Sequence, residues 1–130
     1  MNTIRTLEQE RAKFCLEKVK NIKSNQDKST QDKFKTAARN LPSFIVSNGL
    51  IPTLAFYKSK EEKKKVYEII NEWLEKRKII ENDALSDLVD KDKDFKTLRL
   101  ATMEVLALAN WFKRIVEFEL DLKEGKKIWK

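Results

Sequence analysis

Apolar side chains recur every three or four residues along almost the whole chain, which is the period of an α-helix. Thr6 and Gln9 have the spacing of a capping box, so the first helix is expected over about residues 6–24. Its apolar face consists of Ala12, Cys15, Leu16, Val19 and Ile22. Because no segment of useful length alternates with the period of two that marks a strand, the pattern predicts an all-α protein.

Residues 37–56 contain both prolines and one of the two glycines of the chain. A second helix is expected to begin near Thr30 and to be kinked at Pro42, whose nitrogen has no hydrogen to donate. It should end at Gly49, because glycine readily adopts the left-handed conformation that terminates helices. A third helix follows directly, with Pro52 in its first turn, where the missing N–H is harmless. The corner offers the core Phe44, Ile45, Leu50, Leu54 and Phe56.

Three further segments complete the expected bundle. Ser59 and Glu62 have the spacing of another capping box, which predicts the start of a helix. Its buried face would be Val66, Ile69, Ile70, Trp73 and Leu74. Residues 84–89 offer one or two helical turns, and a long final helix is expected over about residues 94–123. Since that helix is apolar over most of its circumference, it should be the central helix of the bundle.

The pattern therefore predicts one compact helical bundle of about five to six helices over residues 1–122. A basic, flexible tail is expected over residues 123–130. No apolar run is long enough to span a bilayer, and residues 1–23 carry charges throughout, unlike a signal peptide. We expect a cytoplasmic protein without membrane contact.

The chain has no histidine and a single cysteine, which restricts the chemistry that it can perform. Histidine-based catalysis and the usual zinc sites are excluded, and the two glycines are too far apart for a nucleotide-binding loop. Cys15 lies among apolar residues at helical spacing, so we expect a buried thiol and not a reactive one. No metal, cofactor or enzymatic activity is predicted.

The net charge of +7 is concentrated in the first half of the chain. Residues 1–65 contain fifteen lysines and arginines against seven acids, whereas residues 66–130 contain thirteen against fourteen. Such asymmetry is typical of a nucleic-acid-binding protein, although lysines also serve simply to solvate a surface. Both interpretations remain open on charge alone.

Glu104 falls beside Leu100 and Leu108 on the helical wheel, so its carboxylate is expected in or near the core. A structural ion pair with Arg11 or Arg39 is favoured, because buried charges persist chiefly when they are paired. A catalytic role for Glu104, with a bound metal or without one, would need a second carboxylate or a nucleophile that the sequence does not place. Core packing is likewise favoured over base stacking for Trp73, Trp111, Phe112 and Phe118. Trp129 is the aromatic residue freest to stack, but docking onto the bundle is favoured for it as well.

Several motifs occur in a particular order, from Arg-Asn-Leu-Pro-Ser-Phe-Ile at 39–45 to Trp-Phe-Lys-Arg at 111–114. Between them stand Asn-Gly-Leu at 48–50, Leu-Ala-Phe at 54–56, Trp-Leu at 73–74 and Thr-Met-Glu-Val-Leu-Ala-Leu at 102–108. In this order they resemble the small subunit of the Cmr complex, the type III-B CRISPR effector that silences RNA. The similarity extends over nearly the whole chain and departs from the family at Pro52.

The resemblance implies a compact all-helical protein without catalytic activity. It also implies that copies stack inside a helical filament built on the guide RNA, beside the subunits that cut the target. With the basic first half, it leads us to expect a surface that contacts the phosphates of guide and target RNA. The residues expected to form it are Lys13, Lys20, Lys23, Lys35, Arg39, Lys58, Lys60, Lys63, Lys64, Lys65 and Arg114.

Residues 81–94 carry six acids and would complement the basic half of another copy in head-to-tail stacking. Partners would then be guide RNA, target RNA, other subunits of the Cmr complex and further copies of the chain. The alternative is a helical protein–protein adaptor whose lysines bind no nucleic acid. That adaptor would associate with its partner through an exposed apolar patch. It would show no salt-sensitive binding of RNA.

Overall fold

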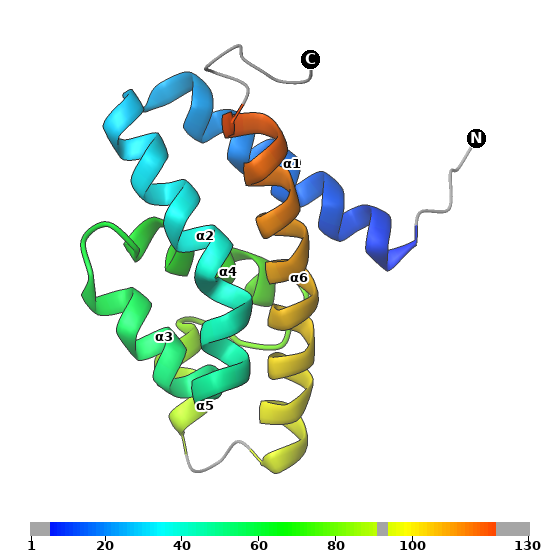
Figure 1. The fold of residues 1–130 in the computed structure, drawn as a ribbon. Coiled ribbons are helices and arrows are strands. Elements are labelled where there is room, and N and C mark those ends of the chain that lie inside the picture. The colour runs from blue at the N-terminus through cyan, green and yellow to red at the C-terminus, as the bar shows by residue number, and fades with distance from the viewer. Residues whose placement is uncertain (1–5, 91–93, 122–130) are drawn as a thin grey trace.

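The computed structural model describes residues 6–90 and 94–121, which form six α-helices and, within those ranges, no β-strand (Figure 1). The helices are α1 (Leu7–Asn25), α2 (Lys28–Asn48), α3 (Leu50–Ser59), α4 (Lys64–Lys76), α5 (Ala84–Val89) and α6 (Phe95–Asp121). The prediction of an all-α bundle with a long C-terminal helix is confirmed. The tail predicted at 123–130, including Trp129, lies outside the described residues.

Polar side chains begin the first two helices. The Thr6 hydroxyl accepts a hydrogen bond from the Gln9 N–H at 3.1 Å, and the Thr6 N–H donates to the Gln9 side chain at 2.8 Å. This is the reciprocal capping box that the spacing predicts. Helix α2 starts slightly earlier than predicted, because the carboxylate of Asp27 caps it by accepting from the Thr30 N–H at 2.8 Å.

A single residue, Gly49, separates α2 from α3. Helix α2 continues through Pro42 to Asn48, where the Gly49 N–H donates to the Ile45 carbonyl at 2.8 Å. Gly49 has φ 88° and ψ 164°, a combination that is essentially restricted to glycine. The carbonyl of Gly49 then accepts from the hydroxyl of Thr53 at 2.8 Å, which ties the first turn of α3 to the corner.

The capping box predicted at Ser59 and Glu62 is wrong. Helix α3 runs on to Ser59, whose hydroxyl donates to the Phe56 carbonyl at 2.9 Å and so serves the end of that helix. Helix α4 starts later, at Lys64, and the residue before it makes no side-chain cap. The apolar face of α3 holds the chain helical through Ser59, so residues 60–63 become the connecting turn.

Helix α6 is not enclosed on all sides as its sequence predicts. It packs chiefly against α1 and α2 and leaves one face outward, where Leu100 and Met103 are 54% and 61% exposed. The expected core position of Phe118 is wrong as well, because this side chain is 63% exposed. Trp73 and Phe112 do pack in the core, and Trp111 is partly buried against it.

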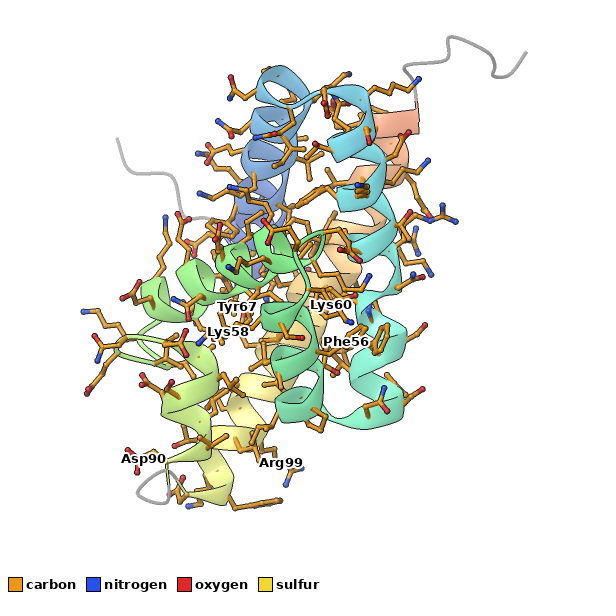
Figure 2. The ribbon with its side chains drawn as sticks, turned by 90° about the vertical axis from the view of Figure 1, so that its left-hand side faces the viewer. Phe56, Lys58, Lys60, Tyr67, Asp90 and Arg99 are labelled. Atoms are coloured by element: carbon orange, nitrogen blue, oxygen red, sulfur yellow. The ribbon has the colours of Figure 1, made fainter. Side chains whose placement is uncertain are left out.

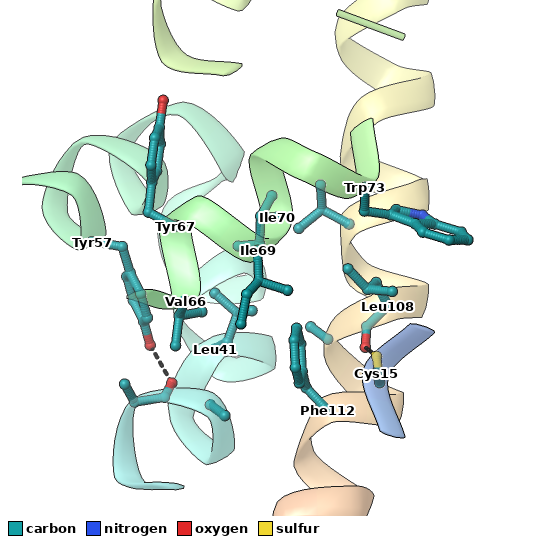
Figure 3. Close-up of a cluster of buried hydrophobic side chains, with 14 of the residues drawn as sticks. Cys15, Leu41, Tyr57, Val66, Tyr67, Ile69, Ile70, Trp73, Leu108 and Phe112 are labelled. Carbon is teal, nitrogen blue, oxygen red and sulfur yellow. Dashed lines mark hydrogen bonds between the residues drawn. The ribbon is translucent and has the colours of Figure 1, made fainter. Parts of the chain in front are cut away.

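The core lies where α2, α4 and α6 meet, around Trp73, Leu41 and Phe112 (Figure 3). The hydroxyl of buried Tyr57 donates to the Ala37 carbonyl at 2.7 Å, so α3 is fixed to α2. Cys15 is fully buried with its Sγ 3.7 Å from the Leu108 carbonyl, and burial raises the pKa of its thiol. Among the described helices, none has both the length and the apolar content of a bilayer span.

Asp83 joins α3, α4 and α5. Its carboxylate accepts hydrogen bonds from the Tyr67 hydroxyl at 2.7 Å, the Lys58 ammonium at 3.0 Å and the Ser86 N–H at 3.1 Å. Burial alone would raise the pKa of Asp83, but these donors outweigh it and lower the pKa to about 2. Lys58, Tyr67 and α5 are therefore held together through one carboxylate.

The Gly49 corner generates a stability prediction. Gly49→Ala should reduce the free energy of unfolding by about 1–3 kcal/mol, because a side chain strains the backbone at this φ and ψ. Chemical denaturation followed by circular dichroism measures the change. Ser47→Ala, an exposed substitution in the last turn of α2, is the control and should leave stability nearly unchanged; equal stability of both variants would contradict the prediction.

Candidate nucleic-acid interface

The end of α3 and the turn after it place lysines on an aromatic ring. The ammonium groups of Lys60 and Lys63 lie 5.6 and 5.7 Å from the centre of the Phe56 ring, and Figure 2 shows Lys60 beside Phe56. Lys63 also lies 5.7 Å from the ring of Tyr57. These distances allow cation–π attraction. The turn therefore presents two cations from a defined position.

Phe56 is itself held in place by α2. Its ring stacks on Phe44, with 5.0 Å between centroids and 26° between planes. Phe44 in turn meets the buried Tyr57 edge-on at 5.7 Å. The aromatic cluster is thus anchored in the core while its outer ring carries the two lysines, so a ligand would meet these charges with less loss of side-chain freedom.

A groove of about 440 Å³ runs between the α1–α2 junction and the beginning of α4. Its basic residues are Lys33, Lys64 and Lys65. A second hollow of about 310 Å³ shares Lys33 and adds Lys63, and a third of about 120 Å³ shares Lys65 and adds Lys18. We call the surface formed by Lys18, Lys33, Lys60, Lys63, Lys64 and Lys65 the basic groove.

Carboxylates also line the basic groove. Lys65 pairs with Glu68 at 3.5 Å and Lys18 with Glu72 at 2.7 Å, and Glu61 and Glu62 stand in the α3–α4 turn. Among the described residues, Lys33, Lys60, Lys63 and Lys64 have no carboxylate within ion-pair distance. Because exposed ion pairs are weak, the paired lysines can also turn to a phosphate.

The structure separates the other sequence-predicted RNA-binding residues from the groove. Lys13 pairs with Glu17 at 2.6 Å, Lys23 with Glu119 at 3.5 Å and Arg39 with Glu117 at 3.4 Å. Lys58 is bound to Asp83, as described above. Lys20 is exposed on α1, Lys35 is half-buried on α2, and Arg114 lies on the outer face of α6.

Of the eleven predicted residues, the structure thus brings together Lys60, Lys63, Lys64 and Lys65. It adds Lys33 and Lys18, which sequence reasoning missed as site residues. Helical spacing places Lys33 on the outer face of α2. Nothing in that spacing shows that the beginning of α2 faces the α3–α4 turn. That juxtaposition depends on how the helices pack.

Glu104 is 5% exposed and makes three charge-assisted or polar contacts. Its two carboxylate oxygens accept from the Nε and Nη2 of Arg11 at 2.8 and 2.9 Å, and one also accepts from the indole N–H of Trp73 at 2.8 Å. The Arg11 hydrogen bonds, together with that of Trp73, hold the pKa of Glu104 below its ordinary value despite burial. Of the two arginines considered from sequence, Arg11 is the partner.

The acidic segment predicted to complement another copy is largely occupied within the chain. Asp83 is bound as described, Asp87 accepts from the backbone N–H of Glu81 at 2.7 Å, and Asp94 caps α6 through the Thr97 N–H at 2.9 Å. Residues 91–93 lie outside the described residues. Within the described ranges, no cluster of three or more Cys, Asp and Glu side chains has the arrangement of a metal site.

The sequence matches the family described as CRISPR-associated protein (Cas_Cmr5) over residues 7–119, which is most of the chain. The chain belongs to the Cmr5 family. The structure is also similar to the X-ray crystal structure of a CRISPR-associated Cmr5 family protein from Thermus thermophilus, with a TM-score of 0.73 and 26% sequence identity. The similarity covers 88% of this chain and 97% of that one.

Membership of the Cmr5 family makes the chain a small subunit of a multi-subunit type III CRISPR effector complex. The family region begins at the first residue of α1 and ends near the last turn of α6, so it includes the whole described bundle. The basic groove, the Asp83 contacts and the Glu104 ion pair all lie within it.

The Glu104 ion pair predicts a pH-dependent loss of stability. Arg11→Met should cost about 3 kcal/mol at neutral pH, because it leaves a buried carboxylate without its cation. Since the folded-state pKa of Glu104 is lowered, the pair stabilises above the unfolded pKa near 4 and stops doing so as the pH falls. The difference between wild type and variant should therefore shrink below about pH 4.

Urea denaturation at neutral and acidic pH measures this difference. The double variant Arg11→Met/Glu104→Gln is the control, because neutralising the carboxylate should recover part of the stability lost in Arg11→Met. Equal losses in the single and double variants, unchanged with pH, would show that the charge of Glu104 does not matter.

Proposed function

We propose that this chain is a non-catalytic small subunit that contacts the backbone of guide and target RNA through the basic groove. The observation that carries the proposal is the convergence of the Phe56-supported lysines with the groove lysines of α2 and α4. Ammonium groups act as point charges on phosphates, so such contact would be independent of base sequence.

The carboxylates in the groove make the expected affinity of one subunit low. Glu61, Glu62 and Glu68 reduce the local potential that the lysines create. If several copies lie along one RNA, weak contacts add up through high effective concentration. Before cleavage, the weak contacts of several subunits would together hold the target in the assembled complex. Because each contact is weak, the target could be released after other subunits cleave it.

The environment of Glu104 supports the non-catalytic part of the proposal. A general acid or base needs access to a substrate proton, whereas both oxygens of this carboxylate are taken by Arg11 and Trp73. The remaining function of Glu104 is to hold α1, α4 and α6 together.

The RNA contact predicts salt-dependent binding. If about five cations engage single-stranded RNA, log K should fall with log salt at a slope near −3.5. The triple variant Lys63→Glu/Lys64→Glu/Lys65→Glu should reduce the magnitude of the slope by about 2 and weaken binding strongly at low salt. Fluorescence anisotropy of labelled single-stranded RNA at several salt concentrations measures both.

The matched control is Lys96→Glu/Arg99→Glu/Lys113→Glu, which changes the charge by the same amount at exposed positions of α6. It should retain most of the salt dependence, because its residues lie away from the basic groove. Identical titrations for both triple variants would mean that net charge, and not the groove, determines binding. Salt-independent behaviour of the wild type would favour the protein adaptor.

We also propose that copies stack head to tail, with the acidic segment 81–94 near the basic groove of a neighbour. Zero-length carbodiimide coupling in the assembled complex should join Glu81, an exposed acid of that segment, to a groove lysine of another copy. Glu81→Gln should remove this product without preventing assembly. Neighbours coupled solely through surfaces remote from residues 81–94 would contradict this arrangement.

A further inference from the structure

The outward face of α6 carries an apolar stripe, which Arg114 interrupts between Trp111 and Phe118. Its residues are Leu100, Met103, Ala107, Trp111 and Phe118, spaced three, four, four and seven apart, and we call them the α6 seam. The stripe extends over about 27 Å of helix. Figure 1 shows α6 at the edge of the bundle, where no other helix covers the outer side of its first half.

The seam requires an explanation because large apolar side chains gathered on one exposed face mark an interaction surface. Leu100, Met103 and Phe118 are each more than half exposed, while the opposite face of α6 packs against α1 and α2. The seam also contains a hollow of about 430 Å³, lined by Glu8, Ala107, Asn110, Trp111 and Arg114. The indole N–H of Trp111 donates to Glu8, so the first turn of α1 forms one wall of this hollow. The seam is thus shaped to receive side chains.

The charges beside the seam indicate its occupant. Lys96, Arg99, Lys113 and Arg114 are exposed on the outer part of α6, and Glu117 there pairs with Arg39. Two copies that met through their α6 helices would bring cations onto cations in either orientation, which disfavours self-association through this face. RNA is disfavoured as well, because single-stranded RNA stacks on a series of aromatic side chains, whereas in the seam the Trp111 indole is partly buried and Phe118 is the one largely exposed ring.

We infer that the α6 seam binds a helix of a different polypeptide, whose apolar face is bordered by Asp and Glu. Its apolar side chains, spaced three and four apart, would pack along Leu100, Met103 and Ala107, and one would enter the hollow at Trp111. Its carboxylates would meet the four cations beside the seam. This inference rests on membership of a multi-subunit complex and does not depend on RNA binding by the basic groove.

Photocross-linking in the reconstituted complex tests the inference. Benzoylphenylalanine replaces Met103 in the seam or, as the control, Val46, which is 73% exposed on α2. Met103 should give at least about five times more cross-linked product than Val46, and mass spectrometry should locate it in an acidic, amphipathic helix of another subunit. A product with a second copy of this chain, a product with RNA, or equal yields at the two positions would overturn the inference.

Charge variants at Met103 test whether the partner helix is acidic or only apolar. Met103→Glu should lower incorporation into the complex about tenfold, and Met103→Lys should lower it less, because lysine suits an acidic partner. Equal loss in both would contradict acidic borders on the partner. Since Met103 is exposed, the thermal unfolding midpoint of the isolated variants should match the wild type. The Met103 variants should bind RNA as the wild type does, and the triple groove variant should retain the Met103 cross-link. The two sets of variants therefore test helix binding by the seam and RNA binding by the groove independently.

Discussion

The bidentate ion pair between Arg11 and Glu104 is the contact on which the bundle depends. It joins α1 to α6, and the Trp73 indole N–H on the same carboxylate adds α4. A buried charge pair contributes little net stability compared with apolar packing, but its geometry admits few alternatives. With all three donors in place, these contacts fix α1 and α4 relative to α6, and so fix two of the three helices that border the groove.

Asp83 has the corresponding role for α3, α4 and α5. By binding Lys58, Tyr67 and the start of α5, it holds the end of α3 near α4. The turn between α3 and α4 is therefore confined at both ends, and Phe56 supports its lysines from below. Sequence position alone groups Lys58 with the basic residues of this turn, yet its ammonium serves the fold.

The two outward surfaces differ in physical character, which suits them to different partners. The basic groove combines lysines with carboxylates on a defined backbone, an arrangement that favours weak, sequence-independent contact with a polyanion. The α6 seam combines exposed apolar side chains with cations on the same outer part of the helix, as expected of a surface that binds an amphipathic helix. A small subunit that links RNA to protein, as we propose for this chain, needs both kinds of surface, and this bundle presents them on different helices.

The sequence by itself determined the helices, their caps at Thr6 and the corner at Gly49, because these depend on neighbours within a few residues. It also indicated that Glu104 needed a cation, since a carboxylate among apolar residues must be compensated. Tertiary structure decided what spacing cannot encode. Arg11 was chosen over Arg39, Lys33 came to lie beside Lys64, and Ser59 ended α3 when it was predicted to begin α4. The outer face of α6 stayed uncovered for the same reason: helical periodicity shows which residues share a face, but packing decides which faces meet.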